Sequence, residues 1–254
     1  MSDQSLWDIH CHIIPSVDDG AQNLEETRKL LQMEYEQGVR NIIVTPHFRR
    51  QMFETPIRTI RKQFSLLQQC VQELNDKYEG NMKVYLGCEL YANMEMTRML
   101  EEGTVSTMAG SGYVLLEFSE NTKSSYIEER IHSLTAVGYR PIIAHIERYE
   151  NLRSDLEMIR NLTEMGAYVQ INAGSILGNS GFFTKRFCRK LMKEDLLHFV
   201  GSDCHDSKYR VCNTGEAYYA VCKKMGQEYA DRIFTENPAQ ILKNAKNRNK
   251  IKNI

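Results

Sequence analysis

The sequence predicts an α/β fold built on parallel strands, most simply a barrel. Three observations lead to this prediction. Amphipathic stretches that end at a glycine recur along the chain, a short and nearly all-apolar run follows them, and a polar residue closes each run. Runs without polar alternation are typical of parallel strands that helices cover on both faces. About seven such units can be counted, which favours a (β/α)7 barrel, with a doubly wound open sheet as the alternative.

The expected strands follow one another along the whole chain. In order they are LWDI (6–9), VRNIIV (39–44), KVYLG (83–87), YVLLEF (113–118), YRPII (139–143), AYVQIN (167–172) and LHFVGS (197–202). Amphipathic helices are expected at 24–37, 125–137 and 155–165, each just before a strand. This alternation of helix and strand is the pattern of a parallel sheet.

The helix ends carry their own signals. Asn23 with Glu26 forms a capping box at the start of the first helix. Gly38, Gly138 and Gly166 follow the three helices at the position where the backbone takes a positive φ, which costs glycine little.

Composition bounds the organisation of the chain. Its 254 residues are 42% hydrophobic and 26% charged, which is ordinary for a globular protein with a sizeable core. We assign residues 1–242 to a single domain. Residues 243–254 contain five Lys or Arg and no acid, and we expect a disordered basic tail there, with weak contact to an anionic membrane surface as a sharper hypothesis.

Charge and cysteine usage exclude several classes of protein. A formal net charge of -1 gives no overall field for nucleic acid, so no nucleic-acid partner is expected. There is no apolar run of transmembrane length and no signal-peptide pattern at the start. Seven cysteines, odd in number and without paired spacing, indicate free thiols in a reducing compartment. We therefore expect a cytoplasmic protein whose oligomeric state stays open.

Most of the histidines stand at or just after the end of an expected strand. These are His10, His12, His47, His145 and His205, and Glu89, Glu117 and Asp203 occupy the same position after other strands. The C-terminal ends of parallel barrel strands meet at one rim, so we expect these side chains to face one pocket. His10 and His12 should point the same way and Cys11 the opposite way. His132 and His198 are expected to be structural.

Carboxylates gathered at one rim repel one another and resist ionisation unless a cation lies between them. Imidazole together with carboxylate suits zinc, manganese or iron. The pattern therefore predicts a multinuclear site for divalent ions. Such ions, about 3.5–4 Å apart, acidify water and hold phosphoryl oxygens in enzymes that hydrolyse phosphate esters.

Seven short motifs carry a resemblance to a known family. They are DIHCH (8–12), DDG (18–20), TPH (45–47), GCE (87–89), LLEF (115–118), AHIERY (144–149) and GSDCH (201–205). Together they resemble the PHP superfamily and, within it, the bacterial tyrosine phosphatases of capsule and exopolysaccharide operons, the CpsB/YwqE type. The resemblance runs from Asp8 to about Pro238. It implies a distorted (β/α)7 barrel of the PHP type and a metal-dependent protein-tyrosine phosphatase.

The resemblance also implies a substrate and a ligand set. The substrate would be phosphotyrosine in the C-terminal tail of a bacterial tyrosine kinase that controls polysaccharide synthesis. Two or three divalent ions would be bound, manganese first, with iron, zinc or magnesium as alternatives. One ion would take His10, His12, Glu89 and Asp203; a second would take Glu89, Glu117 and His145; and a third would take Asp19, His47 and His205. Asp18 remains an alternative to Asp19.

Arginines are expected to complete the pocket. Arg148 follows His145 by three residues and Arg210 follows His205 by five; a guanidinium there would grip two phosphate oxygens and stabilise developing charge. His47 or His205 would assist the leaving group. Arg49 and Arg50 would steer an acidic phosphopeptide toward the pocket, or simply form solvated surface.

Three rival interpretations remain open. CHDSKYR (204–210) matches the C-x5-R phosphate loop of cysteine-dependent tyrosine phosphatases, although Asp206 inside it would repel phosphate. A small phosphate monoester such as histidinol phosphate is an alternative substrate for the metal site. The third alternative is not an enzyme but a non-catalytic protein that binds a tyrosine kinase.

Overall fold

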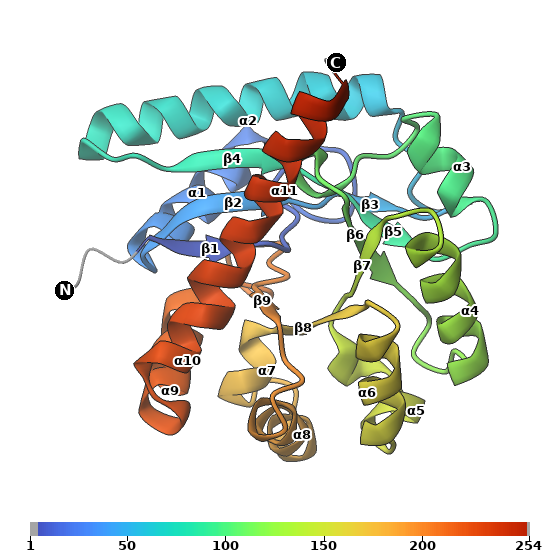
Figure 1. The fold of residues 1–254 in the computed structure, drawn as a ribbon. Coiled ribbons are helices and arrows are strands. Elements are labelled where there is room, and N and C mark those ends of the chain that lie inside the picture. The colour runs from blue at the N-terminus through green and yellow to red at the C-terminus, as the bar shows by residue number, and fades with distance from the viewer. Residues whose placement is uncertain (1–4, 253–254) are drawn as a thin grey trace.

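Parallel strands in two sheets form the centre of the computed structural model, which describes residues 5–252, with side chains as far as residue 247 (Figure 1). One sheet has the order β1-β2-β4, with β1 at Leu6–Asp8, β2 at Val39–Val44 and β4 at Lys83–Leu86. The other has the order β3-β5-β6-β7-β8-β9, with β3 at His47–Phe48, β5 at Glu89–Tyr91, β6 at Tyr113–Glu117, β7 at Arg140–Ile143, β8 at Tyr168–Asn172 and β9 at Phe199–Gly201.

The two sheets are parts of one barrel. The amide of Gly87 donates to the carbonyl of Val44 (2.8 Å), and the amide of Glu89 donates to the carbonyl of Pro46 (3.1 Å), so pairing continues where β2 passes into β3 and β4 into β5. On the other side, Cys11 and Cys204 form a parallel bridge that joins the path of β1 to that of β9. The result is seven strand paths, and the prediction of a distorted (β/α)7 barrel is confirmed.

Helices cover the outside of the strands (Figure 1). They are α1 (Leu24–Glu36), α2 (Ile57–Tyr78), α3 (Met96–Glu101), α4 (Ser124–Thr135), α5 (Glu150–Arg153), α6 (Leu156–Glu164), α7 (Ala173–Leu177), α8 (Phe182–Lys193), α9 (Thr214–Met225), α10 (Gln227–Asp231) and α11 (Asn237–Lys252), with short helical turns at Met108–Gly110, Ile146–Arg148 and Arg232–Glu236. All three glycines expected at helix ends have φ between +82° and +97°. No helix in the described part of the chain is long and apolar enough to cross a bilayer.

The start of α1 differs in part from the prediction. The side chain of Asn23 caps the helix, accepting from the amide of Glu26 (3.0 Å). The Glu26 carboxylate, however, accepts from the amide of Ser207 (2.6 Å), far along the chain. The capping box is therefore half formed, because Glu26 anchors the loop after β9 instead.

Side chains alternate between two cores along each strand. Tyr113 and Leu115 belong to a small buried cluster with residues of β1, β2, β7 and β9, whereas Val114 and Leu116 join the large cluster that contacts the helices. We place the small cluster inside the barrel. Glu117 continues the inward series of Tyr113 and Leu115. The apolar barrel interior thus ends at the rim, where ionisable side chains replace hydrophobic ones.

The end of the chain corrects one expectation. Residues 243–252 continue α11 rather than forming a disordered tail, and only 253–254 of the expected tail lie outside the described residues. Ile241 and Ala245, four residues apart, are both buried, and Asn244 Oδ1 accepts from the amide of Gly112 (2.7 Å). These contacts lie on both sides of residue 242, and the assignment of residues 1–242 to a single domain stays a prediction.

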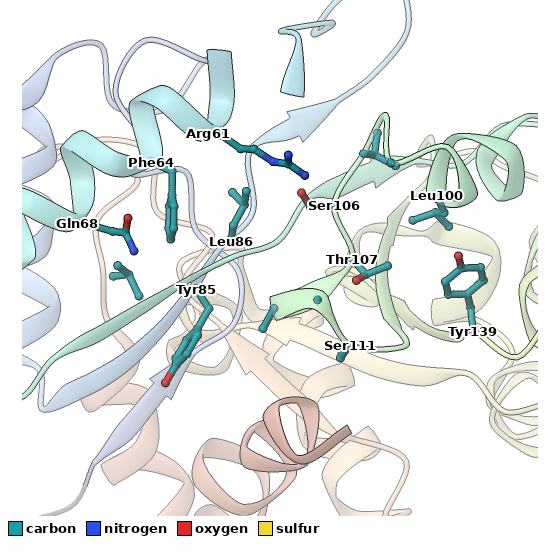
Figure 2. A pocket seen from close by; sticks show the side chains of 15 residues that line it. Arg61, Phe64, Gln68, Tyr85, Leu86, Leu100, Ser106, Thr107, Ser111 and Tyr139 are labelled. Carbon is teal, nitrogen blue, oxygen red and sulfur yellow. The ribbon is translucent and has the colours of Figure 1, made fainter. Parts of the chain in front are cut away.

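A cavity of about 610 Å³ lies between α2, β4 and the loop before β6 (Figure 2). Phe64 and Gln68 line it from α2 and Tyr85 lines it from β4, while the side chain of Arg61 extends toward Ser106. None of its lining residues belongs to the predicted ligand set.

Candidate metal centre

His10 and His12 lie on the segment that carries β1 to the C-terminal rim. The amide of Asp203 donates to the carbonyl of His10 (2.7 Å), which fixes this segment against β9. The Nε2 atoms of His10 and His12 are 3.3 Å apart, so both imidazoles face one point. Cys11 is fully buried and lies against Cys204, away from that point. The opposite directions expected from the two-residue spacing are present.

Glu89, the first residue of β5, is at the centre of the imidazoles. Its Oε2 lies 3.2 Å from His10 Nε2, 3.3 Å from His12 Nε2 and 3.0 Å from His47 Nδ1. Its Oε1 lies 2.8 Å from His145 Nε2. Burial alone would favour the neutral acid, but the imidazoles of His10 and His47 outweigh it and hold the pKa of Glu89 well below its ordinary value.

Glu117 adds a second carboxylate to this group. It lies 3.8 Å from His47 Nδ1 and 4.0 Å from His145 Nε2. Burial and the neighbouring charge of Glu89 raise the pKa of Glu117 to about 7. The pKa of His145 falls to about 4, because burial and the charge of Arg148 disfavour the imidazolium. Neutral imidazole and paired carboxylates are the donors that divalent ions need.

Asp203, after β9, joins the histidines to the two predicted arginines. Its Oδ1 lies 3.6 Å from His10 Nε2 and forms an ion pair with Arg210 Nη2 (2.8 Å). Its Oδ2 accepts from Arg148 Nη2 (2.5 Å). Arg148 and Arg210 remain 37% and 40% exposed and line a cavity of about 130 Å³ next to Asp203. Their guanidinium groups can therefore reach a ligand in that cavity.

The two neighbouring aspartates of the DDG loop, Asp18 and Asp19, have different surroundings. Asp18 is buried and accepts from His12 Nδ1 (2.8 Å) and from the amide of His47 (2.9 Å). Asp19 is 48% exposed, and its Oδ1 lies 3.5 Å from His205 Nε2 and 3.6 Å from His47 Nε2. Asp18 orients histidines, whereas Asp19 presents an oxygen to the same space as their ring nitrogens. This geometry favours Asp19 as the ligand.

Gly20 is needed for the DDG loop to pack against the histidine segment. A Cβ at this position would lie 2.0 Å from the carbonyl oxygen of His12 and 2.5 Å from its Cβ. Any side chain would push the loop away from His12, and with it Asp18 and Asp19.

The donor set fits divalent cations. The ligand atoms form four compact groups, each spanning at most 4.8 Å: His12, Asp19, His47 and His205; His10, His12 and Glu89; His10, His145 and Asp203; and His47, Glu89 and Glu117. Among the described residues, no N–H or O–H reaches the buried Glu89 Oε2 or His205 Nε2 with hydrogen-bond geometry. These two atoms face other ligand atoms without a hydrogen-bond partner of their own, which is the arrangement expected for a shared positive ion.

The four groups do not match the three ligand sets that the resemblance implied, because some residues are grouped with other partners. His12 lies with Asp19, His47 and His205 as well as with Glu89, and Asp203 lies with His145. All nine predicted ligand positions nevertheless meet at one rim.

Four supporting residues were not predicted. Gln170 Oε1 accepts from the amide of His145 (2.7 Å), Asn172 Nδ2 donates to Asp203 Oδ2 (2.7 Å), and Asp8 Oδ1 accepts from the amide of His10 (3.1 Å). The hydroxyl of Tyr149 lies 3.4 Å from His145 Nδ1. The sequence contained a signal for three of these residues. Gln170 and Asn172 are polar residues in the apolar strand VQIN, and Asp8 is the acid that opens DIHCH. Buried polar groups at strand ends need hydrogen-bond partners.

Arg49 and Arg50 make local contacts near the rim. The guanidinium of Arg49 lies 4.2 Å from the ring centroid of Tyr91. Arg50 is paired with Glu95. The charge of Arg50 is thus partly compensated, and both arginines make contacts of their own outside the ligand set.

The cysteine-dependent alternative does not fit the structure. Cys204 is fully buried, and its thiol lies 3.7 Å from Glu34 Oε1, behind the strand rather than in the pocket. Asp206 accepts from the amides of Lys208 (2.8 Å), Tyr209 (2.6 Å) and Arg210 (3.2 Å). The amides that would hold a phosphate in such a loop are therefore already occupied by a carboxylate.

A parallel barrel whose C-terminal rim gathers imidazoles and carboxylates belongs to the class of metal-dependent hydrolases. Within that class, this chain is a member of the CpsB/CapC family of capsular polysaccharide synthesis, whose family model matches residues 6–243. The resemblance seen in the motifs is confirmed.

Characterised relatives cover nearly the whole chain. Tyrosine-protein phosphatase CpsB of Streptococcus agalactiae serotype III is 38% identical over 245 residues, which is 94% of this chain and 99% of the relative. Tyrosine-protein phosphatase YwqE of Bacillus subtilis is 32% identical over 242 residues, covering 94% and 92%.

Solved structures agree with the fold. One of the crystal structures of YwqE from B. subtilis and CpsB from Streptococcus pneumoniae, described as unique metal-dependent tyrosine phosphatases, superposes with a TM-score of 0.85 at 32% identity, covering 94% of each chain. The phosphotriesterase homology protein of Escherichia coli shares the fold at a TM-score of 0.60 and 16% identity.

Proposed function

We propose that this protein is a metal-dependent protein-tyrosine phosphatase. The observation that carries the proposal is the convergence of four imidazoles on the buried carboxylate of Glu89, with two half-buried arginines on the nearby Asp203. Relatives that align over nearly the whole chain are named tyrosine-protein phosphatases, which supports the same activity here.

The rim residues would hold two or three divalent ions, with manganese first and iron, zinc or magnesium as alternatives. Their ligands would be His10, His12, Asp19, His47, Glu89, Glu117, His145, Asp203 and His205. When bound, such ions supply positive charge to the phosphoryl oxygens and make water acidic enough to act as the nucleophile. Asp18, Gln170 and Asn172 would keep the ligands in place through the hydrogen bonds described above.

The arginines would act on the substrate directly. Arg148 and Arg210 approach Asp203 from its two oxygens and keep part of each guanidinium open to the cavity. Each would donate to phosphate oxygens and stabilise the charge that develops during transfer. The leaving group is a phenol with a pKa of about 10, so protonation by His47 or His205 would be helpful rather than essential.

Replacing Arg210 by alanine is expected to lower kcat/KM on a phosphotyrosine peptide by about a hundredfold, because one charged donor to the phosphate is lost. Arg210→Lys should recover only part of this loss, since an ammonium cannot grip two oxygens in one plane. Arg160, also 40% exposed and paired with carboxylates, is the matched control on α6. Steady-state kinetics in which Arg210→Ala behaves like Arg160→Ala would contradict this role.

The proposed substrate is phosphotyrosine on a protein, and we propose the C-terminal tail of a bacterial tyrosine kinase. Purified protein loaded with Mn²⁺ is expected to hydrolyse a phosphotyrosine peptide with a kcat/KM at least about tenfold above that for histidinol phosphate. His145→Ala is the control for activity that does not come from this site. A preference for histidinol phosphate would replace the proposal with a small-molecule phosphatase, and binding of the peptide without turnover would support a non-catalytic partner.

A further inference from the structure

A second group of metal-ligating side chains lies behind the rim, on the side of β1 and β9 that faces α1. It consists of Asp8, Cys11, Glu34, Cys204 and Cys212, and none of them is more than 2% exposed. The rim chemistry does not use these thiols or Glu34. Three thiols and two carboxylates are therefore enclosed together in the hydrophobic core without an assigned role.

Three of the five side chains converge, and the two other thiols adjoin them. Ligand atoms of Asp8, Glu34 and Cys204 all lie within 4.8 Å of one another. The thiol of Cys204 lies 3.7 Å from Glu34 Oε1. Cys11 lies beside Cys204 across the strand bridge, and Cys212 reaches Glu34 from the segment before α9. The cluster thus joins β1, β9, α1 and the start of α9.

One atom in this cluster lacks a partner. Within the described residues, Glu34 Oε2 is fully buried and accepts no hydrogen bond. Asp8 differs, because its Oδ1 accepts from the amide of Ser202 (2.9 Å) and its Oδ2 from the Ser202 hydroxyl (2.5 Å). Burial, followed by the charge of Asp8, raises the pKa of Glu34 well above its ordinary value. Either a proton or a cation must compensate this carboxylate.

We propose that Asp8, Glu34, Cys204 and Cys212 bind one divalent ion of the zinc class, with Cys11 at the edge of the site. Sulfur ligands select zinc-like ions over manganese or magnesium, and four buried ligands without an open position are typical of a structural site. Binding would release the thiol protons to solvent and leave thiolates on the ion. The ion would tie α1 to the strand ends that carry His10, His12 and Asp203.

Cobalt(II) gives a readout that separates this site from the rim. Thiolate ligands produce a sulfur-to-cobalt charge-transfer band in the near ultraviolet, and the predicted rim ligands are all nitrogen or oxygen. Full-length protein reconstituted with Co²⁺ is expected to show this band. Cys204→Ser and Cys212→Ser should each lose it, and zinc analysis should find one ion per chain fewer than in the wild type. Cys188→Ser, at a buried cysteine on α8, should retain both the band and the ion.

Glu34→Gln distinguishes a metal from a proton. A protonated carboxyl tolerates the isosteric amide, whereas a metal ligand does not, so we expect Glu34→Gln to lose the ion and to unfold at a lower temperature. The proposal is overturned if the wild-type cobalt protein lacks the thiolate band, or if Glu34→Gln keeps the wild-type band and metal content. Because neither measurement uses turnover, both results are independent of the phosphatase activity. Both results can also be obtained if a cysteine variant fails to fold, because they need only the wild-type protein and Glu34→Gln.

Discussion

Glu89→Gln is expected to lower the turnover of a phosphotyrosine peptide by at least about a thousandfold, which corresponds to about 4 kcal/mol of transition-state stabilisation. The carboxylate oxygen Oε2 lies within 3.3 Å of ring nitrogens of His10, His12 and His47. An amide removes the negative charge shared by those groups and offers N–H donors or a neutral oxygen in its place. The rim would then bind its ions weakly.

Metal analysis and kinetics on the same sample check this prediction. The metal content of Glu89→Gln should fall together with its activity, while circular dichroism should show an intact fold. Glu95→Gln, at an exposed ion pair with Arg50 and Arg98, is the comparison variant and should retain both. A Glu89→Gln protein with wild-type turnover would contradict the proposed role of the rim as a metal centre.

Chelation should have an equally large effect on the wild type. Treatment with EDTA is expected to reduce turnover to the level of the uncatalysed reaction, and added Mn²⁺ should restore it. Alkylation with iodoacetamide should leave turnover intact under native conditions, since the thiol of Cys204 is fully buried. The opposite pattern, with activity lost on alkylation and kept in EDTA, would restore the cysteine mechanism.

Chelated protein should also become less stable as the pH rises above about 6.5. Glu117 has a pKa of about 7 in the folded chain against 4.5 ordinarily, so its contribution to stability is lost as the pH rises through 7. His12 acts in the same direction: burial opposes its charged form, but Asp18 outweighs burial and raises the pKa well above 6.5. His145 opposes this trend: its pKa is lowered from 6.5 to about 4, so its contribution to stability grows mainly between these two values and only a small remainder is gained above pH 6.5.

Thermal unfolding in EDTA at about pH 6.5 and at about pH 8 measures this change of stability with pH. The midpoint temperature of unfolding should be lower at about pH 8 than at about pH 6.5. Mn²⁺ should make the midpoint less dependent on pH, because the bound ion replaces the protons. An unfolding midpoint in EDTA that rises over this interval would contradict the described electrostatics.

The barrel and the rim could be predicted because each depends on a local pattern. Residues at the ends of successive strands must converge once the strands are parallel, and this brought His10 and Asp203 together from opposite ends of the sequence. The choice between Asp18 and Asp19 could not be made in the same way. Both lie in the same loop, and only the folded structure shows that Asp18 contacts His12 Nδ1 whereas Asp19 faces His47 and His205.

Two further features depend on tertiary contacts that no local pattern shows. The basic composition of residues 243–254 suggested a disordered tail, but α11 continues through residue 252, and Ile241 and Ala245 within it are buried. Arg148 and Arg210 were predicted as phosphate ligands, yet their common contact with Asp203 required knowing how two loops meet.

The bridge between Cys11 and Cys204 places the first and last strands of the barrel next to each other. During synthesis, His10 and His12 leave the ribosome early, but Asp203 and His205 follow only after nearly two hundred further residues. A nascent or prematurely terminated chain that stops before β9 therefore lacks part of every described donor group except those around Glu89. Phosphatase activity would therefore require synthesis of the segment that carries Asp203 and His205, which would keep chains that stop before β9 from acting on phosphotyrosine.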